Sequence, residues 1–379
     1  MDLEESANLL NLTGRYLHLR ARLGETESLY VAALRIREKI LGPSNLAVAS
    51  SLYNLGWLYL DQGRYNEAET LLIRALDVRI SLSDRENKEV ALTLEKLGFI
   101  RYHLGRYTDA ERAFKESAEI AERILGPNAL ETAEILGSLG GFYVSQRKNG
   151  IAEQLLRRTL DLKEKLLGAN HYRLAGTLND LGIIYRHQRM FREAEDLYLR
   201  DLALTEESFG VNYPRLATTL NNLALIYQDQ GQLEKAESLH DRALRIAETG
   251  LGKEHPETTD SLIKLAVLYR LQSRFDDSER LLLRSLSIRE KTLGPDHPDV
   301  AKNLTEMGRL YRDQRKYSAG EPVLKRSLTI LKRTVGTDNP NTVEAMALYA
   351  TILRGMNRKG EAQKFEAQAR KIDHKSSRK

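Results

Sequence analysis

From residue 186 onward arginine recurs at multiples of 42 residues, and its guanidinium can bind a carboxylate or phosphate through two parallel hydrogen bonds. The row comprises Arg186, Arg270, Arg312 and Arg354, with Gln228 interrupting it. Two interpretations are open: the row binds acidic groups of a ligand, or it forms salt-bridge ladders within the protein. Acidic residues in the same stripe favour the ladders, and they are Asp180, Asp229, Asp260, Glu306, Asp313 and Glu344.

A second candidate site combines aromatic and small residues. Tyr53, Trp57, Leu60, Phe99 and Tyr102 supply large apolar side chains. One repeat later, small or short side chains take their place, at Gly137, Ser138, Gly141, Val144 and Ser145. An aromatic wall beside a floor of small residues predicts a pocket for an apolar side chain. The alternative is that the aromatic residues only pack against neighbouring helices.

Residues for catalysis or metal binding do not form a recognisable pattern. The chain has no cysteine, and its eight histidines are scattered without an H-E-x-x-H motif. No glycine-rich phosphate loop, nucleophile elbow or kinase signature occurs. Adjacent carboxylates such as Asp276 and Asp277 fit the start of a helix, where they complement its dipole. We therefore expect neither an enzyme nor a metal site, and no cofactor.

The chain repeats itself every 42 residues without insertion or deletion over almost nine copies. We name each column of equivalent positions by its member in the second copy. The 56 column is small, as in Leu55-Gly56, Leu97-Gly98 and Leu139-Gly140. The 69 column is acidic and ends in Gln363, and its other members are Glu27, Glu69, Glu111, Glu153, Glu195, Glu237, Glu279 and Glu321.

Each copy predicts two antiparallel helices. Leu52, Leu55, Gly56 and Tyr59 have the spacing of one helical face, and a turn at residues 62–64 follows. The second helix is expected from about Tyr65 to Leu82. Small residues at the 56 and 68 columns let the two helices approach closely.

The loops between copies carry helix-ending and helix-starting residues. Gly294 can adopt the left-handed conformation that ends a helix, and Pro298 and Asp299 suit the first turn of the next helix. One helix pair cannot cover its own apolar face, so neighbouring copies must stack. The fold class is therefore all-α, a solenoid of about nine antiparallel helix pairs.

The predicted organisation is a single solenoid over residues 1–369, followed by a basic, disordered tail at 370–379. The expected repeats span residues 5–46, 47–88, 89–130, 131–172, 173–214, 215–256, 257–298 and 299–340, with a partial repeat or cap at 341–369. The three glycines Gly137, Gly140 and Gly141 fall in one helix, which makes the fourth repeat the weakest or most bent of the series.

The segments TLNNLALIYQDQGQLEKAESLHDRAL (219–244) and LGKEHPETT (251–259) resemble the 42-residue tetratricopeptide repeats of kinesin light chains. The resemblance covers almost the whole chain. It implies a right-handed superhelix, a TPR superhelix, whose first helices line a concave groove that holds peptides. The groove positions are then the 50, 53, 54, 57, 60 and 61 columns. His255 and His297 match the structural His-Pro pair of this family.

The resemblance also assigns a role to asparagine. In kinesin light chains, an asparagine at the 54 column hydrogen-bonds the backbone of a bound peptide. This chain keeps Asn54 and Asn222 there, with Asn179 and Asn221 one residue before that column. Peptide capture of this kind is thus expected only locally. The asparagine that a chaperone-type carboxylate clamp needs at the 57 column is absent, which argues against binding of chaperone C-termini.

Charge and hydropathy indicate the class of partner. The net charge of +5 lies in the last 26 residues, where nine basic and three acidic residues give +6 and leave −1 for the rest. A nucleic-acid ligand is therefore not expected. No stretch is apolar enough to span a membrane and no signal peptide is present, so we expect a cytoplasmic protein.

The predicted function is a non-catalytic scaffold that binds a protein or peptide in the groove. It is expected to be a monomer or a weak homo-oligomer. The alternative is the regulatory or sensor arm of a larger signalling ATPase or enzyme whose catalytic domain lies outside this sequence.

Overall fold

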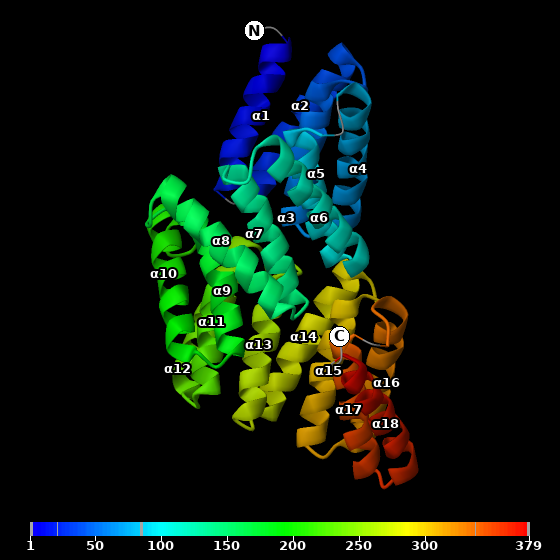
Figure 1. The fold of residues 1–379 in the computed structure, drawn as a ribbon. Coiled ribbons are helices and arrows are strands. Elements are labelled where there is room, and N and C mark those ends of the chain that lie inside the picture. Colours follow the sequence, from blue (N-terminus) through cyan, green and yellow to red (C-terminus); the bar gives the residue numbers. More distant parts are fainter. Residues whose placement is uncertain (1–2, 21, 84–85, 338, 377–379) are drawn as a thin grey trace. The chain divides into compact units, whose positions relative to one another are not determined.

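The computed structural model describes residues 3–20, 22–83, 86–337 and 339–376, and within them helices joined by short loops make up the fold, with no strand. Figure 1 shows the helices in chain order. They are α1 (Leu3–Leu19), α2 (Leu23–Leu41), α3 (Leu46–Asp61), α4 (Tyr65–Leu82), α5 (Lys88–His103), α6 (Tyr107–Ile124), α7 (Leu130–Ser145), α8 (Asn149–Leu167), the short 3₁₀ helix η1 (Tyr172–Leu174), α9 (Ala175–His187), α10 (Phe191–Phe209), α11 (Leu216–Asp229), α12 (Leu233–Gly250), α13 (Thr258–Leu271), α14 (Phe275–Leu293), α15 (Pro298–Asp313), α16 (Tyr317–Thr334), α17 (Pro340–Gly355) and α18 (Lys359–Ser376).

These eighteen α-helices of the described residues confirm the all-α solenoid predicted from the repeats. The second helix expected from Tyr65 to Leu82 is α4. The two helices of one repeat pack together, as α3 does with α4 and α5 with α6, and the second helix also contacts the first helix of the next repeat. First helices of successive repeats are neighbours as well, for example α5 with α7 and α7 with α9.

The chain divides into two compact units, Met1–Ile226 with Thr249–Leu251, and Tyr227–Glu248 with Gly252–Lys379. One continuous solenoid through residue 369 therefore stays a prediction.

The boundary predicted at residue 369 differs from the end of the last helix, because α18 continues to Ser376. Ala369 is buried and Ile372 packs against the same apolar cluster, so contacts with the last repeat extend the helix. Residues 370–376 are thus helical in the part of the predicted tail that the structure describes. The rest of that tail, residues 377–379, lies outside the described residues.

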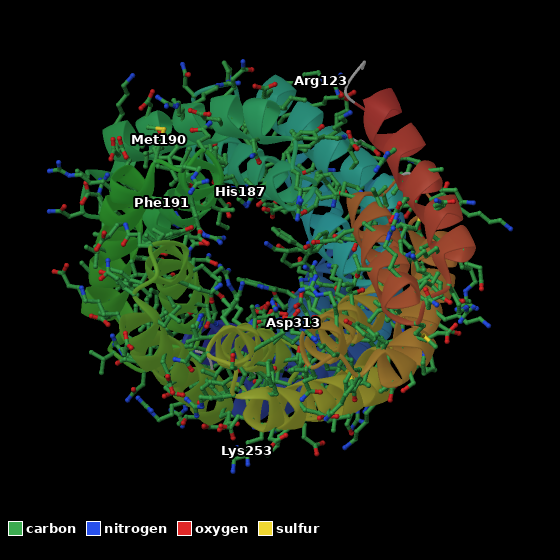
Figure 2. The ribbon with its side chains drawn as sticks, turned by 90° about the horizontal axis from the view of Figure 1, so that it is seen from below. Arg123, His187, Met190, Phe191, Lys253 and Asp313 are labelled. Atoms are coloured by element: carbon green, nitrogen blue, oxygen red, sulfur yellow. The ribbon has the colours of Figure 1, made fainter. Side chains whose placement is uncertain are left out.

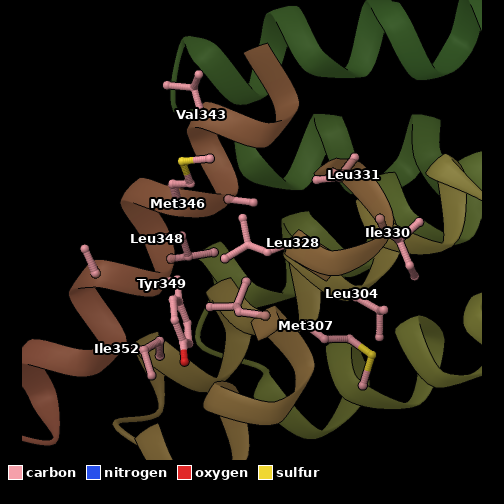
Figure 3. Packing of buried hydrophobic residues seen from close by; sticks show 14 of the residues in the cluster. Leu304, Met307, Leu328, Ile330, Leu331, Val343, Met346, Leu348, Tyr349 and Ile352 are labelled. Atoms are coloured by element: carbon pink, nitrogen blue, oxygen red, sulfur yellow. The ribbon is translucent and has the colours of Figure 1, made fainter. Parts of the chain in front are cut away.

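The apolar core runs through each unit between the helices of a pair and between pairs. In the C-terminal unit it joins α15, α16 and α17, where Leu304, Leu328 and Met346 are almost completely buried. Figure 3 shows these side chains interleaved with those of Met307 and Tyr349. The stacking of one helix pair on the next therefore buries apolar side chains that a single pair would leave exposed to water.

The small residues of the 56 column make room for one side chain of the second helix. A Cβ atom on Gly56 would lie 2.9 Å from Leu72, and one on Gly182 would lie 2.5 Å from the ring of Tyr198. The column was predicted to let the helices approach. The structure shows that the space is filled by the residue sixteen positions later.

The acidic 69 column links adjacent repeats. Glu27 on α2 accepts hydrogen bonds from the Tyr59 hydroxyl at 3.0 Å and from Arg64 at 2.7 Å, both in the next repeat. Glu111 does the same with Tyr143 at 3.1 Å and with a lysine of the α7–α8 turn. Partly exposed ion pairs of this kind add little free energy each. They fix the register between repeats.

The inter-repeat loops behave as the sequence predicts. Gly294 ends α14 with a positive φ of 90°, and Pro298 begins α15. Nδ1 of His297 accepts a hydrogen bond from the backbone N–H of Asp299 at 3.1 Å, and His255 does so with Glu257 at 3.2 Å. His297 is therefore the N-cap of α15, whereas His255 stabilises the turn that precedes α13; both have a structural role.

We predict that Gly182→Ala lowers the free energy of unfolding by about 1 to 3 kcal/mol, because the added methyl group overlaps the Tyr198 ring. Gly150→Ala is the matched control, since nothing lies within 4 Å of a Cβ atom there. Chemical denaturation followed by circular dichroism measures both. Equal stability of the two variants would contradict this account of the 56 column.

Candidate functional site

A cavity of about 480 Å³ lies in the N-terminal unit, along the first helices of the third, fourth and fifth repeats. Its walls come from α5, α7 and α9, with single residues from α6, α8 and the segment before α11. The lining residues are Phe99, Tyr102, His103, Phe114, Glu134, Gly137, Ser138, Gly141, Phe142, Ser145, Lys163, Gly176, Thr177, Asp180 and Arg215.

The cavity exists because α7 lacks two groove-facing side chains. The 57 column holds Trp57, Phe99, Gly141 and Ile183 in successive repeats, and the 53 column likewise has glycine at 137. Gly140 has a different role, because a Cβ atom there would lie 2.8 Å from Leu156 of the core. Two of the three glycines in α7 therefore open the cavity, and the third belongs to the packing between α7 and α8.

One wall of the cavity consists of four aromatic rings that contact one another. Phe99 meets Phe114 edge to face with ring centroids 5.0 Å apart, and Phe114 lies 5.4 Å from Phe142. Tyr102 meets Phe142 edge to face at 6.4 Å. Because the rings support each other, this wall is a preformed apolar surface.

The opposite side of the cavity carries charged groups. The Glu134 carboxylate pairs with Arg173 at 3.1 Å. The Lys163 ammonium, which is buried, donates to the carbonyl of Arg173 at 3.2 Å and to the Thr177 hydroxyl at 3.3 Å. Asp180 is half-buried, and its Oδ2 would lie only 2.7 Å from a Cβ atom on Gly141. The missing side chain of Gly141 thus leaves room for this carboxylate.

Burial shifts the pKa values of these groups away from their ordinary ranges. Burial raises the pKa of Asp180 to about 7, an effect that Arg215 and Lys163 oppose and Asp201 reinforces. Burial also raises the pKa of Glu134 and lowers the pKa of Lys163. Perturbed pKa values of this kind gather at binding sites because charges there are held away from water.

Of the predicted aromatic residues, the cavity contains Phe99 and Tyr102 but neither Tyr53 nor Trp57. Trp57 packs against the His18 ring, with the two ring centroids 4.6 Å apart. The Lys96 ammonium lies 5.4 Å from the centroid of the Trp57 ring. Tyr53 lies under the guanidinium of Arg79, 4.9 Å from the ring centroid. The first two aromatic residues thus fit the packing alternative, whereas the other two fit the pocket.

The predicted asparagines form hydrogen bonds within the chain. Asn54 donates to Asn11 at 3.3 Å, and Asn222 donates to Asn179 at 3.1 Å. Asn179 donates in turn to Asp201 and Thr219. Asn221 is buried. Peptide-backbone capture by these four residues stays a prediction.

The arginine row forms internal ion pairs in the C-terminal unit. Arg270 pairs with Asp313 at 2.5 Å, and Arg312 pairs with the same carboxylate at 2.7 Å. Figure 2 labels Asp313, the acidic centre of this pair of contacts. Arg186 is half-buried on α9 in the other unit. The salt-bridge ladder that the mixed charges favoured is therefore present at Arg270 and Arg312.

Sequence reasoning missed the charged side of the cavity. The charge pattern marks Asp180 only as an acidic member of the arginine stripe, and it does not mark Glu134, Lys163 or Arg215. Lys163 does carry a periodic signal, since its column has Arg37, Arg79 and Arg289 in other repeats. Arg215 precedes α11, and Arg173 is the one other arginine in its column.

Comparisons with known proteins agree with the repeat pattern. The family model described as "Tetratricopeptide repeat" matches residues 5–81, 89–165, 137–207, 215–291 and 257–333. Within the described residues no group of three or more His, Cys, Asp or Glu side chains could hold a metal ion, and no helix there is long and apolar enough to cross a membrane. A comparison with curated proteins gives no match.

Several solved structures are similar to this chain. A Rap protein complexed with Competence and Sporulation Factor has a TM-score of 0.70 at 12% identity, and the match covers 99% of each chain. Aspartyl phosphate phosphatase F from Bacillus subtilis has a TM-score of 0.53 at 13% identity and covers 98% of this chain and 95% of its own. A Podosopora anserina kinesin light chain with nearly identical TPR-like repeats is 24% identical, with a TM-score of 0.46 over 55% of this chain and 98% of its own.

We predict that Asp180→Asn stabilises the protein at pH 8 by roughly 2 to 4 kcal/mol and has a much smaller effect at pH 4. The folded protein holds the Asp180 proton up to about pH 7, whereas the unfolded chain releases it near pH 4. The wild type therefore loses stability as the pH rises through this window, and the variant avoids that loss. Chemical denaturation at several pH values measures the difference, with the exposed Asp196→Asn as control. A difference that does not change with pH would contradict the prediction.

Proposed function

This chain belongs to the tetratricopeptide repeat family, and on that premise we propose that it is a non-catalytic scaffold whose cavity between α5, α7 and α9 binds a side chain of a peptide or partner protein. The repeats and the similar solved structures suggest a protein-interaction scaffold in general. Our proposal extends this general role by naming the location of the binding site and a peptide or protein side chain as its ligand.

The single observation that carries the proposal is the cavity beside Gly141, where the 57 column lacks a side chain. A leucine or an aromatic residue at this position would match its column and bury more apolar surface, and glycine inside a helix costs about 1 kcal/mol relative to alanine. The chain instead keeps a cavity of about 480 Å³ with an aromatic wall. This volume falls in the range of sites that bind a large side chain or a small molecule.

The similar Rap protein is an example of this fold in complex with another molecule. It is described as complexed with Competence and Sporulation Factor. At 12% identity this likeness concerns the fold, so no residue role is transferred from it. A cytoplasmic location and a monomeric or weakly associated state, both expected from the sequence, belong to the same proposal.

The proposal predicts that dodecapeptides selected from a random phage-displayed library bind the wild type and lose at least tenfold in affinity for Gly141→Leu. The leucine side chain would occupy the cavity. Phe99→Ala should also weaken binding, because it removes part of the aromatic wall.

Gly150→Leu is the matched control, since it introduces the same residue type where a Cβ atom meets open space. Equal circular dichroism spectra would show that all the variants are folded. Peptides that bind Gly141→Leu as well as the wild type would contradict the proposed site. Failure to select any peptide would favour the alternative of a regulatory arm.

A further inference from the structure

An ammonium group is already held beside the cavity by the chain itself. The Lys96 Nζ atom lies 5.4 Å from the ring centroid of Trp57 and 5.5 Å from that of Phe99. Its charge is balanced by the Glu95 carboxylate at 3.1 Å. Aromatic faces attract cations, and this attraction grows when the cation is shielded from water. Trp57, Phe99 and Glu95 therefore form a complete site for an ammonium group, which the Lys96 side chain occupies.

The next repeats preserve part of this arrangement and lack the cation. The column of Lys96 continues as Ser138 and Asp180, and the column of Trp57 and Phe99 continues as Gly141. Ser138 is turned toward the previous repeat, because its hydroxyl donates to Glu95 at 2.6 Å. Phe99 and Asp180 both line the cavity. The column of Lys96 supplies no basic side chain between them, because it holds serine and then aspartate in the next two repeats.

Asp180 interacts electrostatically with Arg215 and Lys163 but forms an ion pair with neither. It forms no hydrogen bond or ion pair with any residue in the described part of the chain. Lys163 is held by the Arg173 carbonyl and Thr177, and Arg215 is exposed to solvent. A half-buried carboxylate without a direct partner is costly to keep ionised.

The other acidic groups of this region are satisfied by the protein. Glu134 pairs with Arg173. Asp201, on α10, accepts hydrogen bonds from Thr219 at 2.7 Å, Thr205 at 3.1 Å and Asn179 at 3.3 Å. Asp180 is therefore the carboxylate of the cavity that a ligand can neutralise.

We propose that the cavity binds a primary ammonium group on an apolar stem, with Asp180 as the counter-ion and with Phe99, Tyr102 and Phe142 around the stem. This inference rests on the proposed function, since it names the ligand chemistry of the same site. In a peptide, the ammonium group comes from a lysine side chain or from the amino terminus.

Three probes of equal size test the inference: 3-phenylpropylammonium, 3-phenylpropanol and 3-phenylpropanoate. We expect ligand-observed NMR titration to give a dissociation constant for the ammonium compound at least tenfold lower than for the other two. Asp180→Asn should reduce this preference to less than threefold and leave the binding of the alcohol unchanged. Gly141→Leu should abolish binding of all three, and Gly150→Leu should not.

The outcomes separate this inference from the proposed function. Equal binding of the three probes, or a preference for the carboxylate, would overturn the ammonium inference and keep the cavity as a binding site. Binding that survives Gly141→Leu, or no binding of any probe, would overturn both. Given an ammonium preference, acetyl-Phe-Lys-amide and Phe-norleucine-amide then distinguish a lysine side chain from an amino terminus.

Discussion

A pair of short amphipathic helices has more apolar surface than it can bury alone, so every repeat depends on contact with its neighbours. Two sets of positions satisfy this constraint. The 56 column leaves space for a large residue of the second helix, as Gly182 does for Tyr198. The acidic 69 column links each second helix to the following repeat, as Glu27 does with Tyr59 and Arg64. The rest of each repeat is positioned by these contacts.

The same division explains how a cavity can exist in a solenoid. Gly140 keeps its contact with Leu156, so the core of the fourth repeat is intact. Gly141 faces Asp180 on α9, and a Cβ atom on Gly137 would lie 3.2 Å from Thr159 on α8, so both positions line the cavity without replacing a core contact of Leu156. The glycines that line the cavity lower helix propensity and remove apolar contacts, but the core packing that defines the fold is kept. Such a local loss of stability is expected where residues serve binding.

Much of the fold could be predicted from the sequence because the periodicity is strict. The bounds of α4, the glycine that ends α14 and the capping role of His297 all follow from local rules. The end of α18 does not follow from local rules. Contacts of Ala369 and Ile372 with the last repeat extend the helix despite the polar composition of that segment.

The site could be predicted only in part, because it depends on which side chains fill which spaces. Phe99 and Tyr102 line the same cavity as Gly137 and Gly141 of α7, which the sequence places in successive repeats. Trp57 was not separable from them, since its neighbours Lys96 and His18 come from adjacent repeats and their direction is not encoded in spacing. The role of Asp180 required knowledge of the space above Gly141.

Hydrogen exchange followed by mass spectrometry, on the chain with and without a selected peptide, tests the central claim most directly. If the cavity is the binding site, the peptide slows amide exchange in α5, α7 and α9, with the largest change in α7, whose glycines line the cavity. Protection confined to the second helices α6, α8 and α10, with α7 unchanged, would contradict the account.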